Sequence, residues 1–576
     1  MAYDLVIQNG TVIDGTGAQQ FRADVAVTDG RIVELGDHLD GAAQTIDADG
    51  LMVAPGFIDP HTHYDAQICW DPQISCSAWH GVTSVVMGNC GVGLAPCRPQ
   101  QHEALAWDLV NVEGMSYDVL SKGVGWGWES FAEYMRVPTR NGIGINMGFL
   151  MALTPLRSYV IGEHAQERAA TPDETAQISA LLGEGMQAGA LGFSTTLATQ
   201  HVGYKGRPLA CRLASRDELA SYAHVLRDLG YGAIEVNLGG AGSSIIPQEQ
   251  LDMVDFLLTE SQRPVTWLSV QTRNDQPTAH RELLDKTAAL IRRGAIPQAS
   301  CQPTELQFNL RNPFILGPYE VCHQLFNRSA EEQATIYADP AFRAAFRQAY
   351  TTSPKAFSGQ WQHIQVCIVE NPEHHDWLGK TIAELSQRQG KDPLDTFFDC
   401  ALADKLGTSF SMAALNFDPP LLQEVVTDSR VMIGLSDAGA HVDMLCNTGY
   451  PTYLLGTWVR ERQTMSWERA VQRITSEPAR FFGLHERGTI ARGKAADLVV
   501  FDPRTVGAGE KQLLEDLPGG EGRFVQYAEG IQSVLVNGVP IVADGRDCGQ
   551  LPGQVLRAGR RQRSKGKGQK SKRQTR

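Results

Sequence analysis

The feature that most constrains the fold of this chain is a long central region in which short apolar runs alternate with helical patterns. A capping box with proline at the first helical position, Thr171-Pro172-Asp-Glu174, opens one such helix, and Ser215 with Glu218 opens another. The apolar runs are Met52-Val53, Val82–Met87, Ile143–Met151, Ala190–Ser194, Ala233–Val236, Val265–Val270 and Val431–Leu435. This alternation predicts a parallel sheet, and so many units favour a (β/α)₈ TIM barrel over an open sheet. We predict an α/β fold with the barrel at residues 55–485 and an insertion around 300–430.

The two ends of the chain have a different sequence pattern, which predicts short strands of alternating polarity separated by turns. Asn9-Gly10 and Asp29-Gly30 lie between apolar runs near the start, and Asp544-Gly545 ends a similar region. Such pairs between apolar runs are strong hairpin signals. Because neither end has enough strands to bury a core alone, the pattern predicts one small β-sandwich domain built from residues 1–54 and 486–555.

Charge is distributed unevenly along the 576 residues, which carry a net charge of −14. Ten of the 51 basic residues lie in 556–576, which leaves 41 basic against 65 acidic residues in the body. An acidic body argues against nucleic acid as the main partner. The basic tail at 556–576 is expected to be disordered, and an RNA-binding role for it remains the less favoured reading.

Composition also bears on location. The first residues lack a basic segment followed by an apolar one, and no stretch of about 18 apolar residues occurs, so neither a secretory signal nor a membrane span is expected. The eleven cysteines are scattered rather than dense. These features indicate a cytoplasmic protein with reduced thiols, and homo-oligomerisation is left open.

The segment with the clearest chemical meaning is Pro55-Gly-Phe-Ile-Asp-Pro-His61-Thr-His63. Two histidines at i and i+2 after an apolar run point the same way off a strand, and at the end of a first barrel strand both would reach the barrel mouth. Neutral imidazole is a good ligand for zinc and similar divalent ions. Two surface histidines are the alternative, which the surrounding sequence makes weaker.

This context resembles the first barrel strand of the amidohydrolase superfamily, and the resemblance extends from residue 3 to about 556. The segment Gly493-Lys-Ala-Ala-Asp497-Leu-Val-Val-Phe-Asp502 is similar to the strand with which the superfamily returns to its sandwich. Gly81-Val-Thr-Ser-Val-Val-Met-Gly-Asn-Cys90 resembles the second barrel strand of the D-aminoacylases. The resemblance implies a metal-dependent hydrolase of this type.

The same resemblance implies roles for two further residues. The cysteine at the position of Cys90 is a zinc ligand in the D-aminoacylases, and a thiolate is a strong zinc ligand, although a buried structural cysteine is the alternative. Val431-Met-Ile-Gly-Leu-Ser436-Asp437 resembles the eighth strand, whose aspartate transfers protons. Asp437 is therefore expected both as a ligand and as the catalytic acid and base, rather than only as a helix cap.

Two positions depart from the D-aminoacylase pattern. The histidines expected after the fifth and sixth strands correspond to Asn237 and Ser269, and no histidine lies between His224 and His280. Gln271 stands where the family has a lysine that helps to hold the substrate carboxylate. We therefore expect a zinc ion, or another divalent metal, on His61, His63, Cys90 and Asp437, with no histidine from those strands.

Other residues are candidates for the substrate site or as replacement ligands. Glu235 lies two residues before Asn237 and is expected to face the same way. His201 follows a segment that resembles the fourth-strand loop and is open to both a binding and a structural role. His441 is a weaker substrate-binding candidate, and Arg157, in a third-strand loop, could meet a carboxylate or form an ordinary salt bridge.

The predicted function is hydrolysis of a carbon–nitrogen bond in a small-molecule amide, such as an N-acyl amino acid, by metal-activated water with Asp437 as general base and acid. A cyclic amide or lactone substrate is an alternative within the same superfamily. A degenerate, non-catalytic barrel is the competing class, which Asn237 and Ser269 favour and the retention of His61, His63 and Cys90 opposes.

Overall fold

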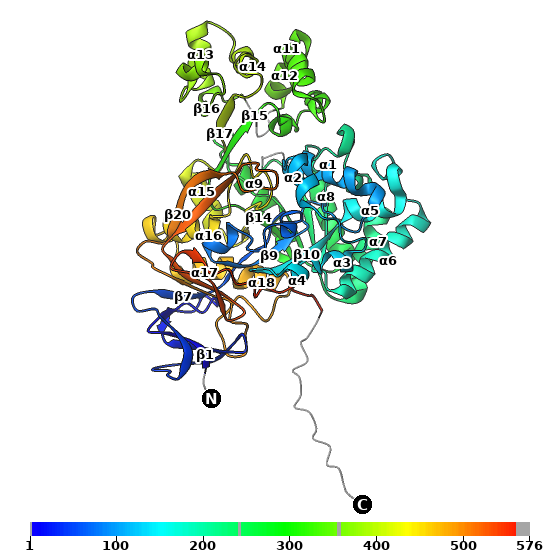
Figure 1. Cartoon of the computed structure of the whole chain (residues 1–576). Coiled ribbons are helices and arrows are strands. Elements are labelled where there is room, and N and C mark those ends of the chain that lie inside the picture. Colours follow the sequence, from blue (N-terminus) through cyan, green and yellow to red (C-terminus); the bar gives the residue numbers. More distant parts are fainter. Residues whose placement is uncertain (1–2, 240–243, 354–356, 358, 560–576) are drawn as a thin grey trace, which may run out of the picture.

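The computed structural model describes residues 3–239, 244–353, 357 and 359–559 of the chain. Figure 1 shows three levels: strands from both termini at the base, a central body, and a smaller unit above it. Within the described ranges, no helix is both long and apolar enough to cross a membrane.

The central body is built on one parallel sheet of eight strands, whose spatial order follows the chain. Its strands are β8 (Phe57–Asp59), β9 (Val82–Met87), β10 (Asn146–Ala152), β11 (Gly192–Thr196), β12 (Ala233–Asn237), β13 (Val265–Leu268), β14 (Ala295–Ala299) and β18 (Met432–Ile433). A parallel bridge between Thr62 and Ala438 joins the segments that follow the first and last strands. The parallel sheet of the α/β prediction is confirmed, and the carboxyl ends of its strands converge on one mouth, as in a barrel.

Helices between the strands follow the sequence signals closely. The Thr171 and Ser215 side chains cap α6 (Pro172–Ala188) and α7 (Arg216–Leu229) through the capping boxes read from the sequence. The buried face of α7 includes Leu219, Tyr222 and Leu226. The other helices of the body are α1 (His102–Glu113), α2 (Tyr117–Gly123), α3 (Phe131–Tyr134), α4 (Val137–Asn141), α5 (Leu153–Ile161), α8 (Gln248–Ser261), α9 (Ala279–Lys286), α10 (Ala288–Arg292), α15 (Pro419–Thr427), α16 (Tyr450–Tyr453), α17 (Trp467–Ile474) and α18 (Ser476–Phe481).

Both chain ends contribute to one seven-stranded sheet at the base. β19 (Leu498–Phe501) lies antiparallel between β7 (Met52–Pro55) and β22 (Ile531–Val536). Buried residues from both ends share a core next to this sheet, including Val27, Val53, Leu498 and Leu535. The other strands of the two ends are β1 (Tyr3–Gln8), β2 (Thr11–Val12), β3 (Phe21–Arg22), β4 (Asp24–Thr28), β5 (Arg31–Gly36), β6 (Ala42–Asp47), β20 (Gly507–Leu514), β21 (Arg523–Glu529), β23 (Val539–Ala543) and β24 (Arg546–Asp547). The expected pairing of both ends is present, and their assignment to a separate sandwich domain stays a prediction.

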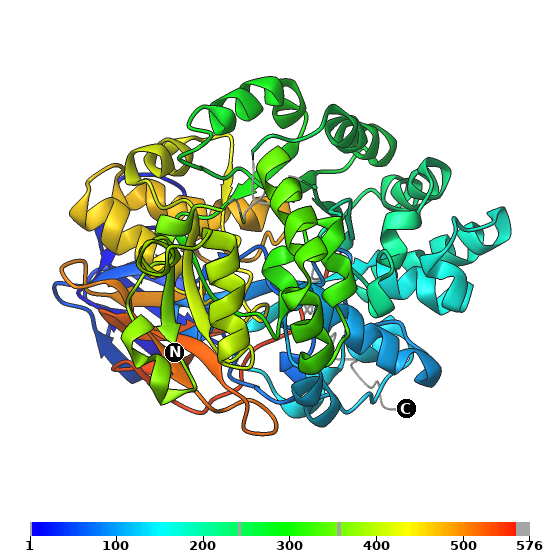
Figure 2. The same ribbon diagram turned by 90° about the horizontal axis from the view of Figure 1, so that it is seen from above.

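The chain between β14 and β18 forms the unit above the body, which we call the insert (residues 304–415; Figures 1 and 2). Its sheet has the order β15-β17-β16 and its buried side chains form a core of their own. The elements are β15 (Thr304–Asn309), β16 (Ile364–Ile368), β17 (Ser409–Leu415), α11 (Ala330–Ala338), α12 (Pro340–Thr352), α13 (Ile382–Gln389) and α14 (Pro393–Ala403). The insert lies within the segment where the sequence indicated an insertion.

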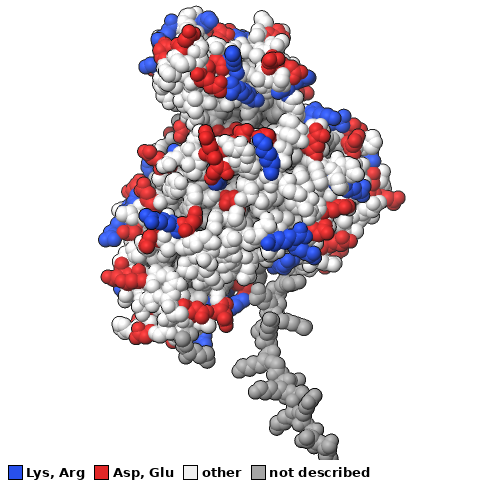
Figure 3. All heavy atoms as spheres, viewed as in Figure 1, with Lys and Arg blue, Asp and Glu red and all other residues white. Residues whose placement is uncertain are grey.

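The folded body extends past the predicted start of the basic tail at residue 556. The Leu556 amide donates to the Met147 carbonyl at 2.7 Å and the Ala558 amide to the Gly189 carbonyl at 3.2 Å. The rest of the predicted tail, 560–576, lies outside the described residues. On the face drawn in Figure 3, acidic and basic side chains are interspersed over the body and the insert.

Candidate active site

The centre of the site is the pair of histidines that follows β8. His61 is fully buried and His63 is 3% exposed, and their Nε2 atoms lie 3.2 Å apart. The Asp59 carboxylate accepts a hydrogen bond from the His61 amide at 3.2 Å and so fixes the turn after the strand. The predicted convergence of both imidazoles is present in the structure.

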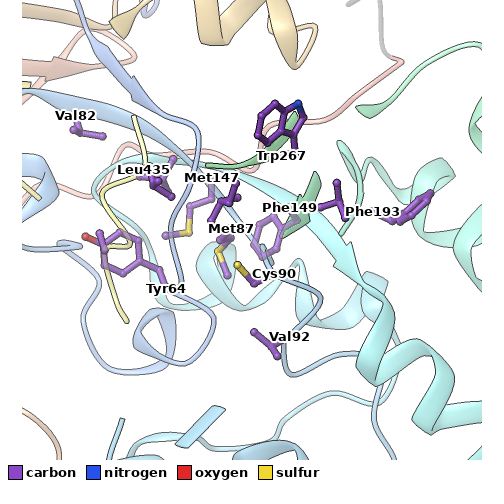
Figure 4. Packing of buried hydrophobic residues seen from close by; sticks show 14 of the residues in the cluster. Tyr64, Val82, Met87, Cys90, Val92, Met147, Phe149, Phe193, Trp267 and Leu435 are labelled. Carbon is purple, nitrogen blue, oxygen red and sulfur yellow. The ribbon is translucent and has the colours of Figure 1, made fainter. Parts of the chain in front are cut away.

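Cys90 reaches this pair from the end of β9. Its Sγ lies 3.6 Å from His61 Nε2, and its backbone amide donates to Glu235 Oε2 at 2.7 Å. Figure 4 shows Cys90 beside Met87 and Phe149, at the edge of the apolar core. Among the described residues, His61, His63 and Cys90 form a group whose ligand atoms all lie within 4.8 Å of one another.

Asp437 completes the cluster from the segment after β18. Its Oδ1 lies 3.4 Å from His61 Nε2 and 3.6 Å from His63 Nε2, and its side chain is 31% exposed. Its φ of 54° is in the left-handed region, which Asp and Asn adopt more readily than most residues. A carboxylate therefore lies between two buried imidazoles and an open space.

The separations from His61 and His63 are close to those expected around a single zinc ion, while Asp437 lies outside the group of His61, His63 and Cys90 whose ligand atoms are all within 4.8 Å of one another. With metal–nitrogen, metal–oxygen and metal–sulfur bonds of about 2.0–2.3 Å, ligand atoms around zinc should lie roughly 3.3–3.6 Å apart. The N–N, N–O and N–S separations of 3.2, 3.4, 3.6 and 3.6 Å are close to that range. The donor set of two imidazoles, a thiol and a carboxylate is also one that zinc accepts.

Electrostatics support a cation at the same place. Burial raises the pKa of Glu113 and of Glu235 to about 8, and Glu235 Oε1 has no hydrogen-bond partner among the described residues. Burial lowers the pKa of His61 to about 3, so this imidazole is neutral and ready to coordinate. Burial would raise the pKa of Asp437, but the hydrogen bond from His63 holds it well below its usual range. Burial would lower the pKa of His63, but the charges of Glu113 and Asp437 raise it to about 9, so with no metal bound this ring is cationic and balances part of the acidic cluster. A bound cation that displaces this proton would take over that role.

The two departures from the histidine pattern lie at the same mouth. Asn237 ends β12, and its Nδ2 donates to Cys90 Sγ at 3.2 Å and lies 3.4 Å from His201 Nε2. Ser269 follows β13 directly, and its hydroxyl accepts from Gln271 Nε2 at 2.9 Å. Neither strand brings a histidine to the cluster, as the sequence indicated.

His201 and His441 line a cavity that opens beside Asp437. Burial lowers the pKa of His201 to about 3 and that of His441 to about 4, so both are neutral near pH 7. The His441 ring lies against Phe314 of the insert, with 4.2 Å between ring centroids. Both predicted substrate-binding histidines are therefore placed where they can contact a ligand.

Arg157 is not brought to this cavity. It is fully buried, its Nε donates to Glu218 Oε2 at 2.9 Å, and further donors reach the Ala165 and Arg168 carbonyls. This guanidinium ties α5 to the start of α7 and has no free face for a substrate. We therefore withdraw Arg157 as a substrate contact.

Sequence reasoning missed Glu113, which lies at the end of α1. One of its carboxylate oxygens is 3.2 Å from His63 Nδ1, the ring nitrogen that faces away from the cluster. Carboxylates that face the second nitrogen of a metal-binding histidine orient the ring and raise its basicity. No motif marks Glu113, because the helix carries it to His63 from fifty residues along the chain.

The cavity has a volume of about 200 Å³ and is shared between the body and the insert. Its floor comes from the ends of β12, β13 and β14 and from Asp437, and its roof from the insert. The lining residues are Gln200, His201, Asn237, Leu238, Ile246, Leu268, Ser269, Gln271, Ser300, Thr304, Leu306, Phe314, Ile315, Pro318, Leu415, Leu435, Asp437, His441, Leu445 and Asn447.

Comparison with known proteins identifies the family of the chain. The Amidohydrolase family profile matches residues 44–542. The chain belongs to the amidohydrolase family. The D-aminoacylase of Alcaligenes xylosoxydans xylosoxydans is 28% identical over 562 residues, which cover 96% of this chain and 97% of that protein. The N-acyl-D-aspartate deacylase of the same organism is 29% identical, with 96% and 95% covered.

Solved structures of other amidohydrolases share the fold. The N-acyl-D-glutamate deacylase of Bordetella bronchiseptica, solved with zinc and a phosphonate inhibitor, is 26% identical, with a TM-score of 0.64 and 97% and 100% of the two chains covered. A D-aminoacylase mutant solved with copper chloride gives a TM-score of 0.67 at 24% identity, with 96% and 100% covered. The chain is an amidohydrolase of the D-aminoacylase-like type.

Proposed function

We propose that the chain hydrolyses the carbon–nitrogen bond of a small-molecule amide with the help of one divalent metal ion, and that the ion is zinc. The observation that carries the proposal is the group formed by His61, His63 and Cys90, whose ligand atoms all lie within 4.8 Å of one another, with Asp437 beside both histidines. The relatives named as acyl-amino-acid deacylases support amide chemistry.

In this proposal His61, His63 and Cys90 hold the ion, with Asp437 at its open side. A zinc ion bound there supplies Lewis-acid polarisation of the acyl oxygen and makes water more acidic. Asp437 faces the cavity and accepts a proton from the attacking water, then delivers it to the leaving nitrogen. Asn237 donates to the Cys90 sulfur and so helps to keep that side chain in position.

The substrate lies in the cavity beside Asp437, with His201 and His441 in reach of its polar atoms. The free state of all eleven cysteines agrees with a reducing compartment, and we assign the protein to the cytoplasm. A cyclic amide or lactone is the second candidate substrate.

The test combines metal analysis with an activity panel. Protein purified without chelator is expected to contain close to one zinc per chain, and to cleave at least one compound from a panel of linear amides, lactams and lactones supplied with Zn²⁺, Co²⁺ or Mn²⁺. Protein that neither contains nor binds a divalent ion would establish the degenerate, non-catalytic alternative instead.

A further inference from the structure

No lysine or arginine is among the described residues that line the cavity beside Asp437. Its ionisable lining side chains are Asp437, His201 and His441. Both histidines are desolvated, and burial favours their neutral form. Apart from the proposed metal ion, which lies at the Asp437 end, the described lining therefore offers a ligand no positively charged side chain.

The polar wall opposite Asp437 is a neutral hydrogen-bond network. Gln271 Nε2 donates to Ser269 Oγ at 2.9 Å, and Asn416 Nδ2 donates to Gln271 Oε1 at 2.9 Å. Asn416 is 1% exposed and accepts from the Thr272 amide at 2.8 Å, so its side chain is fixed. Gln271 and Ser269, both uncharged and held by Asn416, therefore form this part of the cavity wall.

The arginine that follows this network is directed elsewhere. Arg273 is 4% exposed, and its Nε and Nη2 donate to Asp275 at 2.8 and 2.6 Å. Glu113 and Glu235 lie behind the metal-binding cluster and add acidic rather than basic groups. A carboxylate placed at this wall, away from the proposed metal ion, would lose its hydration and would find no lysine or arginine among the described lining side chains.

The remaining lining is apolar and comes from both the body and the insert. It includes Leu238, Ile246, Leu268, Leu306, Phe314, Ile315 and Leu415. Hydrocarbon lying against these side chains gains from the removal of water. The described lining therefore combines hydrogen-bonding carboxamides with an apolar roof and includes no lysine or arginine.

We propose that the substrate is an uncharged amide with an apolar arm, and that it has no carboxylate next to the scissile nitrogen. This inference rests on the proposed amide hydrolysis and specifies its substrate class. Gln271 is its specificity-determining residue, because its side chain lies in the cavity wall and offers an amide rather than an ammonium group.

A matched pair of substrates tests the inference directly. N-acetyl-leucine, as both enantiomers, and N-acetyl-3-methylbutylamine differ only in the carboxylate, and each is assayed with the zinc-supplied full chain. We expect kcat/KM for the neutral amide to be higher than for N-acetyl-leucine by roughly tenfold or more, because the carboxylate finds no partner of opposite charge at the cavity wall. Equal or faster cleavage of either leucine derivative overturns the inference and leaves amide hydrolysis standing.

Failure of the proposed function gives a different result. If neither compound is cleaved, amide hydrolysis of this class fails, and calorimetric titration of the same two compounds into the zinc-supplied protein still decides the charge argument. Tighter binding of the neutral amide supports an uncharged ligand. Tighter binding of N-acetyl-leucine, or binding of neither compound, overturns it.

Two variants of Gln271 provide the internal control. Gln271→Lys adds a cation at the wall and is expected to shift the ratio of kcat/KM for the two amides roughly tenfold toward the carboxylate. Gln271→Met has a similar volume and no charge, so it should lower kcat/KM for both substrates and leave their ratio unshifted. A ratio that is unchanged in Gln271→Lys, in protein with normal circular dichroism, contradicts the role assigned to this residue.

Discussion

Replacing Asp437 with asparagine is the sharpest test of how the site works. The change keeps the shape of the side chain and removes its capacity to accept a proton. Asparagine also tolerates the φ of 54° at this position, whereas most other residues would strain the backbone there. The Asp437→Asn protein is therefore expected to fold normally, and its defect to report on chemistry.

The structure indicates how much of the lost activity in Asp437→Asn comes from weaker metal binding and how much from lost proton transfer. Asp437 is 31% exposed and lies at the edge of the cluster, while His61, His63 and Cys90 are buried and approach one another without it. Most of the metal should remain. Loss of a general acid and base lowers kcat by roughly 10²–10⁴-fold, which corresponds to about 2.7–5.5 kcal/mol in activation free energy.

The assay measures kcat on the best substrate of the panel and zinc per chain on the same preparation. Asp376→Asn is the matched control, because Asp376 is an exposed residue of the insert that pairs with Arg388 at 3.2 Å. It should leave both quantities unchanged. Normal turnover by zinc-loaded Asp437→Asn would refute the assigned proton transfer, and loss of zinc together with turnover would make Asp437 mainly a ligand.

Three other perturbations test separate parts of the site and the fold. The double change His61→Ala with His63→Ala should abolish zinc binding. Zinc at 100 times its Kd stabilises a protein that binds it by about 2.7 kcal/mol, so the variant should lose the zinc-dependent rise in Tm. An undiminished rise in Tm contradicts the proposed site. Asn237→Leu removes the hydrogen bond to Cys90 Sγ and should weaken zinc binding roughly 10–100-fold in a chelator competition, whereas unchanged affinity would make that contact incidental. Arg157→Leu removes the buried ion-pair partner of Glu218 and should lower the free energy of unfolding in urea by about 3–5 kcal/mol. The more exposed Arg168→Leu should lower it much less, and similar losses for both would refute the buried pair.

The sequence was most informative where one local pattern carries one element. Capping boxes at Thr171 and Ser215 predicted the starts of α6 and α7, and continuous apolar runs predicted β9 and β12. β14 was missed, because Pro297 and Gln298 interrupt its apolar run. Its strand character comes from parallel pairing with β13 and β18, which no local pattern shows.

The same limit applies to the candidate site. His61, His63, Cys90 and Asp437 each follow a strand, so barrel geometry alone predicts that they meet. Arg157 was expected in the loop after the third strand, but it lies in α5 directly after β10, and its partner Glu218, 61 residues away, holds it in the core. Two features depend on the tertiary structure: ion pairs between distant segments, and the cavity roof that the insert supplies. The sequence of a single strand and its loop does not predict either of them.

The charge of the site connects the departures in the sequence with the proposed substrate. Asn237, Ser269 and Gln271 lie at the ends of adjacent strands, and each is neutral. Asn237 and Ser269 provide no imidazole for a second ion, and Gln271 provides no ammonium group for an anion. Cys90, Asp437, Glu113 and Glu235 remain as acidic groups around the place of a single divalent ion. Since that ion must balance several of them, an anionic substrate would add uncompensated negative charge, while a neutral amide would not.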